Sequence, residues 1–438
     1  MSDLLEMARK VAHKAKARGA QGVQASVYRS RDSELEWRDG KIDRLRESTR
    51  MGVGVTLYVD GRYSSNSTSD LRDSAIEHFL DDTVATTRVL AADPHRKLPD
   101  PARYASRFQG DLEVFDTASM SPSERRKLAR SLEEAARANP DAGEIISVTS
   151  SCSNSTSESA MVCSNGMEGQ RRRSTFALFA ETSVKDEGDR KPEGWWYAVQ
   201  RHKADLPPIA TIGQEATRRA LGMRGAKPEK SGQYACAIEN AVAGRLLGDL
   251  IGPLHGQDIQ QKRSFLADRL GQDIGSAALT IVDDPLLPRG LSSRTYDGEG
   301  MSTIKRPIFT RGKLETFFLD TYYASKLGKE PTTAGTSNLV FEAGERDLDG
   351  LLAAMGTGIL ITGFSGGNSN PATGDFSIGI RGYWIEKGRR ARPLAEMNLA
   401  GNHLEFWKKL AEMGKDAYVY SSWRTPSMRF EPVQFSGT

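Results

Sequence analysis

Hydrophobic periodicity divides the first half of the chain into alternating helices and strands. Apolar residues recur at helical spacing over residues 2–18, and apolar and polar residues alternate over residues 22–28. Two Asp-Gly pairs mark the turns of two hairpins, residues 33–46 and 51–65. Asp70 then caps a helix that extends to about residue 91. The pattern predicts a helix, a β-meander and a second helix.

The same order of signals returns after a proline-bearing linker at residues 92–109. A helix, strands that turn at an Asn-Gly pair, and another helix follow over residues 121–222. In both passages a Ser-Thr pair begins eight positions after a turn glycine. These positions are Gly40 and Ser48 in the first passage, and Gly166 and Ser174 in the second. Chance recurrence of turn residues is the simpler alternative, but we infer a duplicated helix–β-meander–helix module that fills a first domain, residues 1–225.

The second half of the chain has short apolar strands separated by glycine and proline. Residues 233–238 predict a strand, residues 239–250 a helix, and residues 252–275 a long polar arm. The later segments are typical of strands, apart from a closing helix over residues 402–414. We therefore expect an α+β protein whose second domain, residues 226–438, is mostly antiparallel β-structure and barrel-like.

A polar loop lies between two apolar strands near the C-terminus. Residues 359–364 are apolar or small, and apolar side chains alternate again from residue 376 to residue 380. Glycine permits positive φ and close backbone approach, and Asn and Asp build rigid turns. Such a loop either binds a ligand or partner or only connects two strands, and its composition leaves both open. The loop positions are Gly366, Gly367, Asn368, Asn370, Pro371, Thr373, Gly374 and Asp375.

Composition and charge narrow the classes of function. The chain has 438 residues and a net charge of +3, which argues against strong non-specific binding of nucleic acid. The aromatic run at residues 195–197 could stack on bases, but packing into the core is the simpler interpretation. Three cysteines fit reduced thiols, although Cys152 and Cys163 could face each other across a hairpin. No run approaches the ~20 apolar residues of a membrane span. We expect a cytoplasmic protein without membrane contact.

No catalytic constellation is evident from residue spacing. The six histidines never fall within four residues of one another or of a cysteine, which argues against a zinc helix or ribbon. Ser365 and Ser369 lack the glycine-flanked elbow of a serine nucleophile. Asp375 could accept a substrate proton or only cap a turn. Glu239 and Asn240 lie at a helix start, where backbone N–H groups are free, and Asn240 could serve only as the helix cap.

The polar loop carries a resemblance to a known family. Residues 366–377, Gly-Gly-Asn-Ser-Asn-Pro-Ala-Thr-Gly-Asp-Phe-Ser, together with residues 382–388 and 399–402, resemble the TldD/PmbA family, once called modulators of DNA gyrase. The match is typical of the PmbA (TldE) side of that family. The resemblance covers nearly the whole chain, and the duplicated module and β-rich second half agree with the fold that it implies.

In the TldD branch, the resemblance implies a helix with the sequence His-Glu-Ala-Val-Gly-His-Gly-Leu-Glu-Gly-Asp. Its histidines bind zinc, its first glutamate is the general base, and a later cysteine is the third ligand. The matching stretch here is residues 239–249, with Glu239 and Gly244 at the histidine positions and Asn240 at the base. No cysteine follows Cys236. A zinc peptidase needs a metal with an open position and a base beside it, so the resemblance implies a metal-free member without a cofactor.

The resemblance implies a non-catalytic subunit of a TldD-type zinc metallopeptidase that acts on unfolded peptides. The partner would be a TldD-like peptidase chain in a heterodimer, or a second copy of this chain, and the polar loop would shape the interface or contact the peptide. An autonomous metal-independent hydrolase that uses Asp375, Ser369 or Glu239 is one alternative. A DNA gyrase-associated binding module is another, which rests only on the family's older name.

Overall fold

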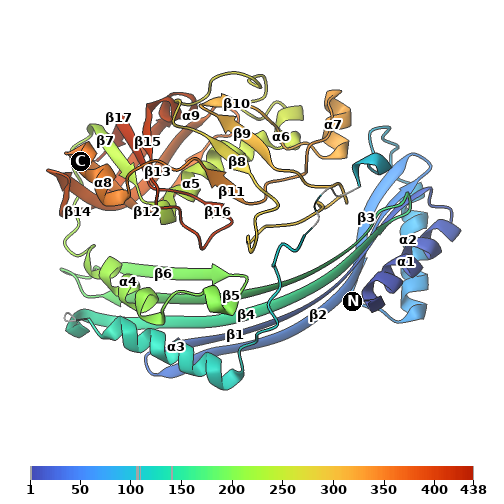
Figure 1. Cartoon of the computed structure of the whole chain (residues 1–438), viewed down its shortest axis with the longest axis horizontal. Helices are drawn as coiled ribbons and strands as arrows, with labels where there is room; N and C mark the ends of the chain where they lie inside the picture. The colour runs from blue at the N-terminus through green and yellow to red at the C-terminus, as the bar shows by residue number, and fades with distance from the viewer. Residues whose placement is uncertain (1, 105–107, 109, 140–141, 438) are drawn as a thin grey trace.

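The computed structural model describes residues 2–104, 108, 110–139 and 142–437, so part of the predicted linker at residues 92–109 lies outside the described residues. The protein is a mixed α/β structure with 26% helix and 39% strand, as expected for the predicted α+β class. A long curved sheet forms one side of the molecule, and the second half of the chain lies over its concave face (Figure 1). Within the described ranges, no helix is long and apolar enough to cross a membrane.

The first half forms one antiparallel sheet of six strands in the order β3-β2-β1-β4-β5-β6. Strands β1 and β4 each begin a meander, and they pair with each other, so the two meanders share one continuous sheet. A helix precedes and follows each meander, which is the element order that the repeat predicts. The elements are α1 (Ser2–Ala17), β1 (Gly22–Arg38), β2 (Lys41–Val59), β3 (Arg62–Thr68), α2 (Asp73–Arg88), α3 (Pro122–Arg137), β4 (Ile145–Cys163), β5 (Glu168–Val184), β6 (Glu193–Gln200) and α4 (Ile209–Leu221).

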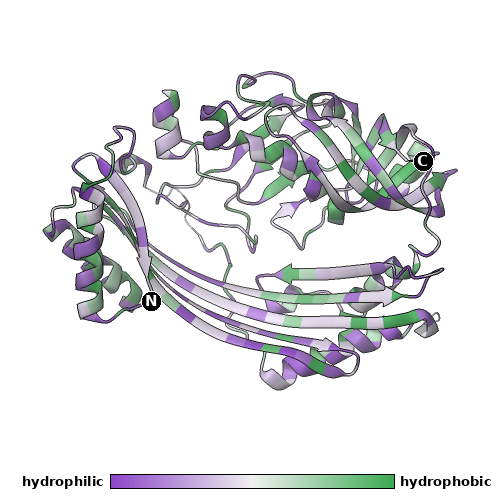
Figure 2. Ribbon diagram, turned by 180° about the vertical axis from the view of Figure 1, so that it is seen from behind, coloured by the Kyte–Doolittle hydropathy of each residue, from purple (hydrophilic) through white to green (hydrophobic). Residues whose placement is uncertain are grey.

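Helices cover only the two ends of this sheet. At one end, α1 and α2 bury a cluster that includes Val23 of β1 and Leu80 of α2. At the other end, α3 and α4 bury a cluster that includes Leu35 of β1 and Ile212 of α4. Between the two ends the strands are more hydrophilic (Figure 2), because a strand that no helix covers gains little from apolar side chains. The sheet is therefore held by two separate cores.

The second half contains a closed barrel of five strands. The strand order is β14-β13-β12-β7-β17-β15, and a further pairing of β14 with β17 closes the ring and leaves β15 outside it. Strands β7 and β12 are parallel, and the other neighbours in the ring are antiparallel. The core of the barrel includes Ile361, Ile378, Leu399 and Phe430. The strands are β7 (Gly232–Ile238), β12 (Gly358–Ser369), β13 (Asp375–Glu386), β14 (Arg389–Asn402), β15 (Leu410–Met413) and β17 (Met428–Ser436).

A second sheet and several short helices pack beside the barrel. This sheet has five strands in the order β10-β9-β8-β11-β16. Its strands are β8 (Ile281–Asp283), β9 (Arg306–Thr310), β10 (Lys313–Leu314), β11 (Leu339–Phe341) and β16 (Trp423–Arg424). The helices of this half are α5 (Asn240–Ile251), α6 (Gly256–Gln260), α7 (Thr321–Leu327), α8 (Leu348–Met355) and α9 (His403–Phe406). The predicted barrel-like, β-rich second half is thus present.

The prediction of a polar arm at residues 252–275 was wrong. This segment contains α6, and its apolar side chains enter the main core of the second half. These side chains are Leu254, Ile259, Phe265, Leu266 and Ile274. Their spacing matches neither a helix nor a strand, so periodicity gave no sign that they are buried.

Three local predictions also need correction. Residues 402–414 are not one helix, because α9 is followed by a 3-10 turn and then by β15, which pairs with β17. Cys152 and Cys163 both lie on β4 as free thiols, so they cannot face each other across a hairpin. Asp70 does not cap α2; its carboxylate binds Arg72, which occupies the cap position. β4 continues through the polar residues between the two cysteines because it pairs with β1 on one side and with β5 on the other.

Candidate functional site

A groove between the two halves of the chain lies at the start of α5. It is open to solvent and offers about 460 Å³ of free space. Its walls come from β6 of the first half, and from α5, β12, β13 and the segment around β16 of the second. The lining residues are Trp195, Tyr197, Ala241, Val242, Gly244, Arg245, Gly363, Phe364, Arg381, Tyr418, Ser421, Ser422, Trp423 and Thr425.

Glu239 joins the two halves beside this groove. It occupies the cap position of α5, but its side chain makes no bond to the helix backbone. Instead its carboxylate binds Arg219 of α4 at 2.6 Å, with 9% and 13% of the two side chains exposed. Arg219 also binds Glu215 at 2.8 Å and lies over the ring of Trp196, 4.2 Å from its centroid. The carboxylate of Glu239 is therefore committed to an ion pair between the halves.

Asn240 is the first residue of α5 and not its cap, which corrects the prediction from sequence. Its side-chain amide donates to the carbonyl oxygen of Asp416 at 2.5 Å. Its backbone N–H donates to Ser427 Oγ at 3.1 Å, and its carbonyl oxygen accepts from Thr425 Oγ1 at 2.6 Å. These bonds fix the segment around β16 against the start of the helix.

Gly244 lies in the groove wall one turn further along α5. A Cβ atom built on this glycine would meet no atom within 4 Å, so the position faces open space. The three positions therefore do not fit a zinc ion, because Gly244 has no donor, Asn240 is an amide, and Glu239 is paired with Arg219. Across the described ranges, no three His, Cys, Asp or Glu side chains come together as a metal site.

The outer part of the β12–β13 hairpin is the polar loop that the sequence singled out. From Ser365 outward it leaves the groove wall and becomes exposed, including Asn368. Gly366 and Gly367 have φ values of 61° and 87°, and the register shifts between Ser365 and Asn368, as in a β-bulge. A Cβ atom at Gly367 would lie 2.3 Å from the carbonyl oxygen of Ser377, so this position requires glycine.

The carboxylate of Asp375 organises the tip of the hairpin. It accepts a bond from Asn402 Nδ2 at 2.9 Å and one from Thr373 Oγ1 at 2.7 Å. These two bonds, that from Asn402 first, lower the pKa of Asp375 below its ordinary value. A carboxylate stabilised in its charged form is a poorer base, so Asp375 builds a turn and is a weak candidate for accepting a proton.

Backbone bonds hold the rest of the tip. The Asn370 N–H donates to the carbonyl oxygen of Asp375, and the Gly374 N–H donates to that of Asn370, both at 2.8 Å. The carbonyl oxygen of Pro371 accepts from the backbone N–H of Phe265 at 2.8 Å. The tip is thus tied to itself and to the domain beneath it, and it presents a fixed surface.

His403 is a neighbour of the loop whose position the sequence did not indicate. It is fully buried, and its ring stacks on Phe265 and Phe376, with centroids at 5.7 Å and 4.5 Å. Burial lowers the pKa of His403 to about 4, so the ring is neutral at pH 7. Its Nδ1 lies 3.3 Å from the indole N–H of Trp407, and its Nε2 lies 3.1 Å from Ser369 Oγ.

This arrangement argues against Ser369 as an activated nucleophile. An indole nitrogen only donates, so Nδ1 of His403 must accept the bond from Trp407. The proton of the neutral ring then resides on Nε2 and points to Ser369 Oγ. A base in a serine hydrolase needs a lone pair at that position. The geometry therefore fits a structural network in the core.

Three models of one protein family match consecutive segments of the chain. The family model for PmbA/TldA metallopeptidase domain 1 matches residues 23–86, the central-domain model matches residues 115–224, and the C-terminal-domain model matches residues 231–437. These matches span most of the chain. The chain belongs to the TldD/PmbA family.

Individual relatives agree with this TldD/PmbA assignment. The metalloprotease PmbA of Escherichia coli O157:H7 is 28% identical over 421 residues, which cover 95% of this chain and 92% of that protein. The crystal structure of a proposed modulator of DNA gyrase from Bacteroides thetaiotaomicron has a TM-score of 0.95 and 39% identity, and covers 99% of this chain and 98% of that one. TldE from Thermococcus kodakarensis has a TM-score of 0.87 at 20% identity, over 98% of this chain and 100% of that one, a likeness of fold alone.

The groove of this TldD/PmbA chain contains aromatic residues that the sequence misassigned. The expectation of a core strand was right for Trp196, which packs against the cluster beneath α3 and α4. It was wrong for Trp195 and Tyr197, which line the groove. Strand alternation places these two on the same face, opposite Trp196. That spacing was the available signal, but nothing local indicated that the second half of the chain covers that face.

Proposed function

We propose that this chain is a non-catalytic, peptide-binding subunit of a TldD-type zinc peptidase. The observation that carries the proposal is the state of α5. The helix that would hold zinc in the TldD branch is present and borders the groove, but Glu239 and Asn240 are bound to protein partners and Gly244 has no side chain. The site can hold a chain in place and supplies no group to cleave it.

The edge of β6 supports binding of an extended peptide. β6 is an edge strand of the six-stranded sheet, and Trp195 and Tyr197 on it line the groove. The carbonyl oxygens of Glu193 and Tyr197 accept bonds from Arg381 at 3.2 Å and from the Tyr418 hydroxyl at 2.8 Å. Backbone groups of every second residue point to the same side of a strand, so those of Trp195 point there too. Because Arg381 and Tyr418 already occupy the two flanking carbonyl oxygens, a peptide can pair with this edge over a short stretch at Trp195.

The exposed β12–β13 hairpin supports contact with a partner. It continues outward from the groove wall, and its tip is held rigid by the bonds of Asp375 and Asn370. A rigid surface loses little conformational entropy on association. We place the contact with a TldD-like chain, or with a second copy of this chain, on this hairpin.

Co-expression with a TldD-like peptidase tests the proposal. The peptidase activity on an unfolded protein such as casein is expected to rise when this chain is present, and the two chains are expected to co-elute. The variant Asn368→Arg, at an exposed hairpin position, should reduce both effects, whereas Ser69→Arg, exposed on the first half, should not. Unchanged peptidase activity with and without the chain refutes the subunit proposal. Stoichiometric zinc in the purified chain, or cleavage by the chain alone, would favour an autonomous enzyme.

A further inference from the structure

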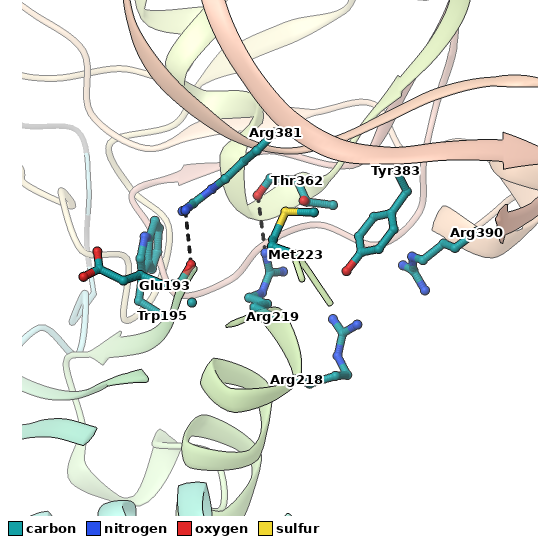
Figure 3. Close-up of a pocket in the computed structure, with 10 residues that line it drawn as sticks. Glu193, Trp195, Arg218, Arg219, Met223, Thr362, Arg381, Tyr383 and Arg390 are labelled. Atoms are coloured by element: carbon teal, nitrogen blue, oxygen red, sulfur yellow. Dashed lines mark hydrogen bonds between the residues drawn. The ribbon is translucent and has the colours of Figure 1, made fainter. Parts of the chain in front are cut away.

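A second, smaller cavity lies beside the groove and is rich in arginine. It lies between α4, β6 and β13, is more enclosed than the groove, and has about 20 Å³ of free space, room for about one water molecule. Figure 3 shows the side chains that line it. Arg218 and Arg219 reach it from α4, and Arg381 and Tyr383 reach it from β13, with Arg390 of β14 behind them. No function described above uses this cavity.

The four arginines are unequally neutralised. Arg218 and Arg219 share the carboxylate of Glu215, at 2.6 Å and 2.8 Å, and Arg219 also binds Glu239. Arg381 makes a hydrogen bond only to the backbone carbonyl oxygen of Glu193, at 3.2 Å, and within the described part of the chain it forms no ion pair.

The neighbouring groups do not supply the missing counter-ion. The side chain of Glu193 points away from the cavity (Figure 3), and Glu193 and Glu181 attract Arg381 only at longer range. Arg390 lies over the ring of Tyr383, 5.7 Å from its centroid, and also lacks an ion pair among the described residues. Burial, and then the charge of Arg219, lower the pKa of Arg381. A partly buried guanidinium without a counter-ion is costly, and an anion in this cavity would relieve that cost.

The groove and the cavity meet at Arg381. Both are lined by Trp195 and Arg381, so a chain that lies along β6 in the groove would reach the cavity at its end. The cavity is too small for a chain to continue through it and has room for little more than a carboxylate oxygen, so only the end of a chain could reach Arg381 from the groove. Planar guanidinium groups bind carboxylates through paired hydrogen bonds.

We propose that this cavity binds the C-terminal carboxylate of the peptide held in the groove, with Arg381 as its main donor. The Tyr383 hydroxyl and Arg390 lie on its other side. This contact fixes the direction of the peptide and favours free chain ends over internal segments. The inference rests on the proposed peptide-binding function and adds the part of the substrate that is recognised.

A competition between two peptide pools tests the inference on the purified full-length chain. One randomised decapeptide pool is synthesised as free acids and the other as C-terminal amides, each with its own dye at the N-terminus, and both are mixed in equal amounts. The expected excess of bound acid over bound amide is about 10-fold or more, the size of a hydrogen-bonded charge pair. Exchange of the two dyes must leave the ratio unchanged.

Variants assign the preference to the cavity. Arg381→Met is expected to bring the ratio of bound acid to bound amide close to one, and Arg381→Lys should retain part of the preference. Arg245→Met is the matched control, because Arg245 lines the groove but is paired with Asp249 at 2.8 Å. It should leave the ratio unchanged. Circular dichroism of each variant verifies that it is folded.

The outcomes separate the two proposals. Equal binding of acid and amide pools overturns the carboxylate site and leaves the peptide-binding function standing. Absence of binding for both pools overturns the peptide-binding function itself. Equal or tighter binding of an amide pool that carries an internal glutamate assigns the cavity to acidic side chains and overturns the terminal carboxylate. Arg381-dependent binding of inorganic phosphate in preference to peptide identifies a phosphate site and also overturns it.

Discussion

Substitutions at Gly244 can test the stability of α5 and the binding of peptide in the groove separately, because this residue belongs to the helix and also lines the groove. It lies inside the helix, at the position that the family resemblance matches to a zinc-binding histidine of the TldD branch. A Cβ atom there would meet nothing within 4 Å. We therefore expect Gly244→Ala to fit without any displacement and to stabilise the helix.

The size of this effect follows from helix propensity. Glycine in a helix interior is about 0.8–1.0 kcal/mol less favourable than alanine, because its unfolded backbone is freer. With no steric cost to subtract, the opening of α5 should become less favourable by about 1 kcal/mol, which is about a fivefold change in the equilibrium constant. Gly248→Ala, in the same helix, should give a similar gain, since its Cβ atom would only touch Trp423 at 3.9 Å.

Native-state hydrogen exchange of α5 measures this change directly. Both alanine variants should slow exchange of the helix amides about fivefold. Gly382→Ala in the barrel is the opposite control, because its Cβ atom would lie 1.8 Å from the carbonyl oxygen of Leu360. Faster exchange in Gly244→Ala would refute the open space at that position. Gly244→Leu should reduce peptide binding, because its side chain would project into the groove. Gly248→Ala should leave peptide binding unchanged.

Three further predictions concern buried charges. Glu239→Ala should lower the free energy of unfolding by about 2 kcal/mol, because Arg219 loses its bond across the halves and keeps only its bond to Glu215. A smaller loss of the urea midpoint in the Glu239→Met, Arg219→Met double variant supports this, and an unchanged midpoint in the single variant contradicts it. The pKa of His403, about 4, lies below its ordinary value of 6.5, so protonation of this residue favours the unfolded chain. Its protonation should lower the free energy of unfolding by about 2 kcal/mol between pH 7.5 and pH 5. Urea midpoints of His403→Gln should lack that part of the slope, and identical slopes would rule it out. Burial raises the pKa of Glu299 to about 7, above its value in the unfolded chain. The stability that the protonated side chain contributes is therefore fully present below pH 4.5 and is lost as the pH rises through 7. Glu299→Gln should therefore gain about 2–3 kcal/mol at pH 8 and little at pH 4.5, and an equal change at both values would refute this.

The sequence predicted correctly those features that depend on the local conformational preferences of a few neighbouring residues. The hairpin turns at residues 39–40 and 60–61 need positive φ, which Asp-Gly pairs supply, and both turns are present. The polar loop of the β12–β13 hairpin was recognisable for the same reason, because Gly367 and the Asn and Asp side chains around it define their own backbone geometry. Such features depend on neighbours in the chain and not on packing.

The groove depends on contacts that no local pattern encodes. Trp195 and Arg381 line the same walls although 186 positions separate them in the sequence. Leu410–Met413 has helix-forming residues, yet it is a strand because β17 offers a free edge. The apolar residues at 252–275 are likewise buried by distant parts of the chain, which their local spacing does not reveal. The resemblance to a sequence motif singled out Glu239, Asn240 and Gly244, but it could not predict that Arg219 and Asp416 bind the first two.

Those partners suggest how the fold keeps its groove without a metal. By the family resemblance, zinc in a TldD chain would tie the α5 helix to a cysteine late in the sequence. In this chain Asn240 ties the same helix to Asp416, Thr425 and Ser427 through three hydrogen bonds. Glu239 adds a link in the other direction, to Arg219 of the first half. Glu239 and Asn240, which the resemblance matches to a zinc ligand and to the general base, therefore act as cross-links, whereas Gly244 makes no side-chain contact. These links hold the groove in shape without a metal, as the proposed role of a subunit that positions a peptide for a partner requires.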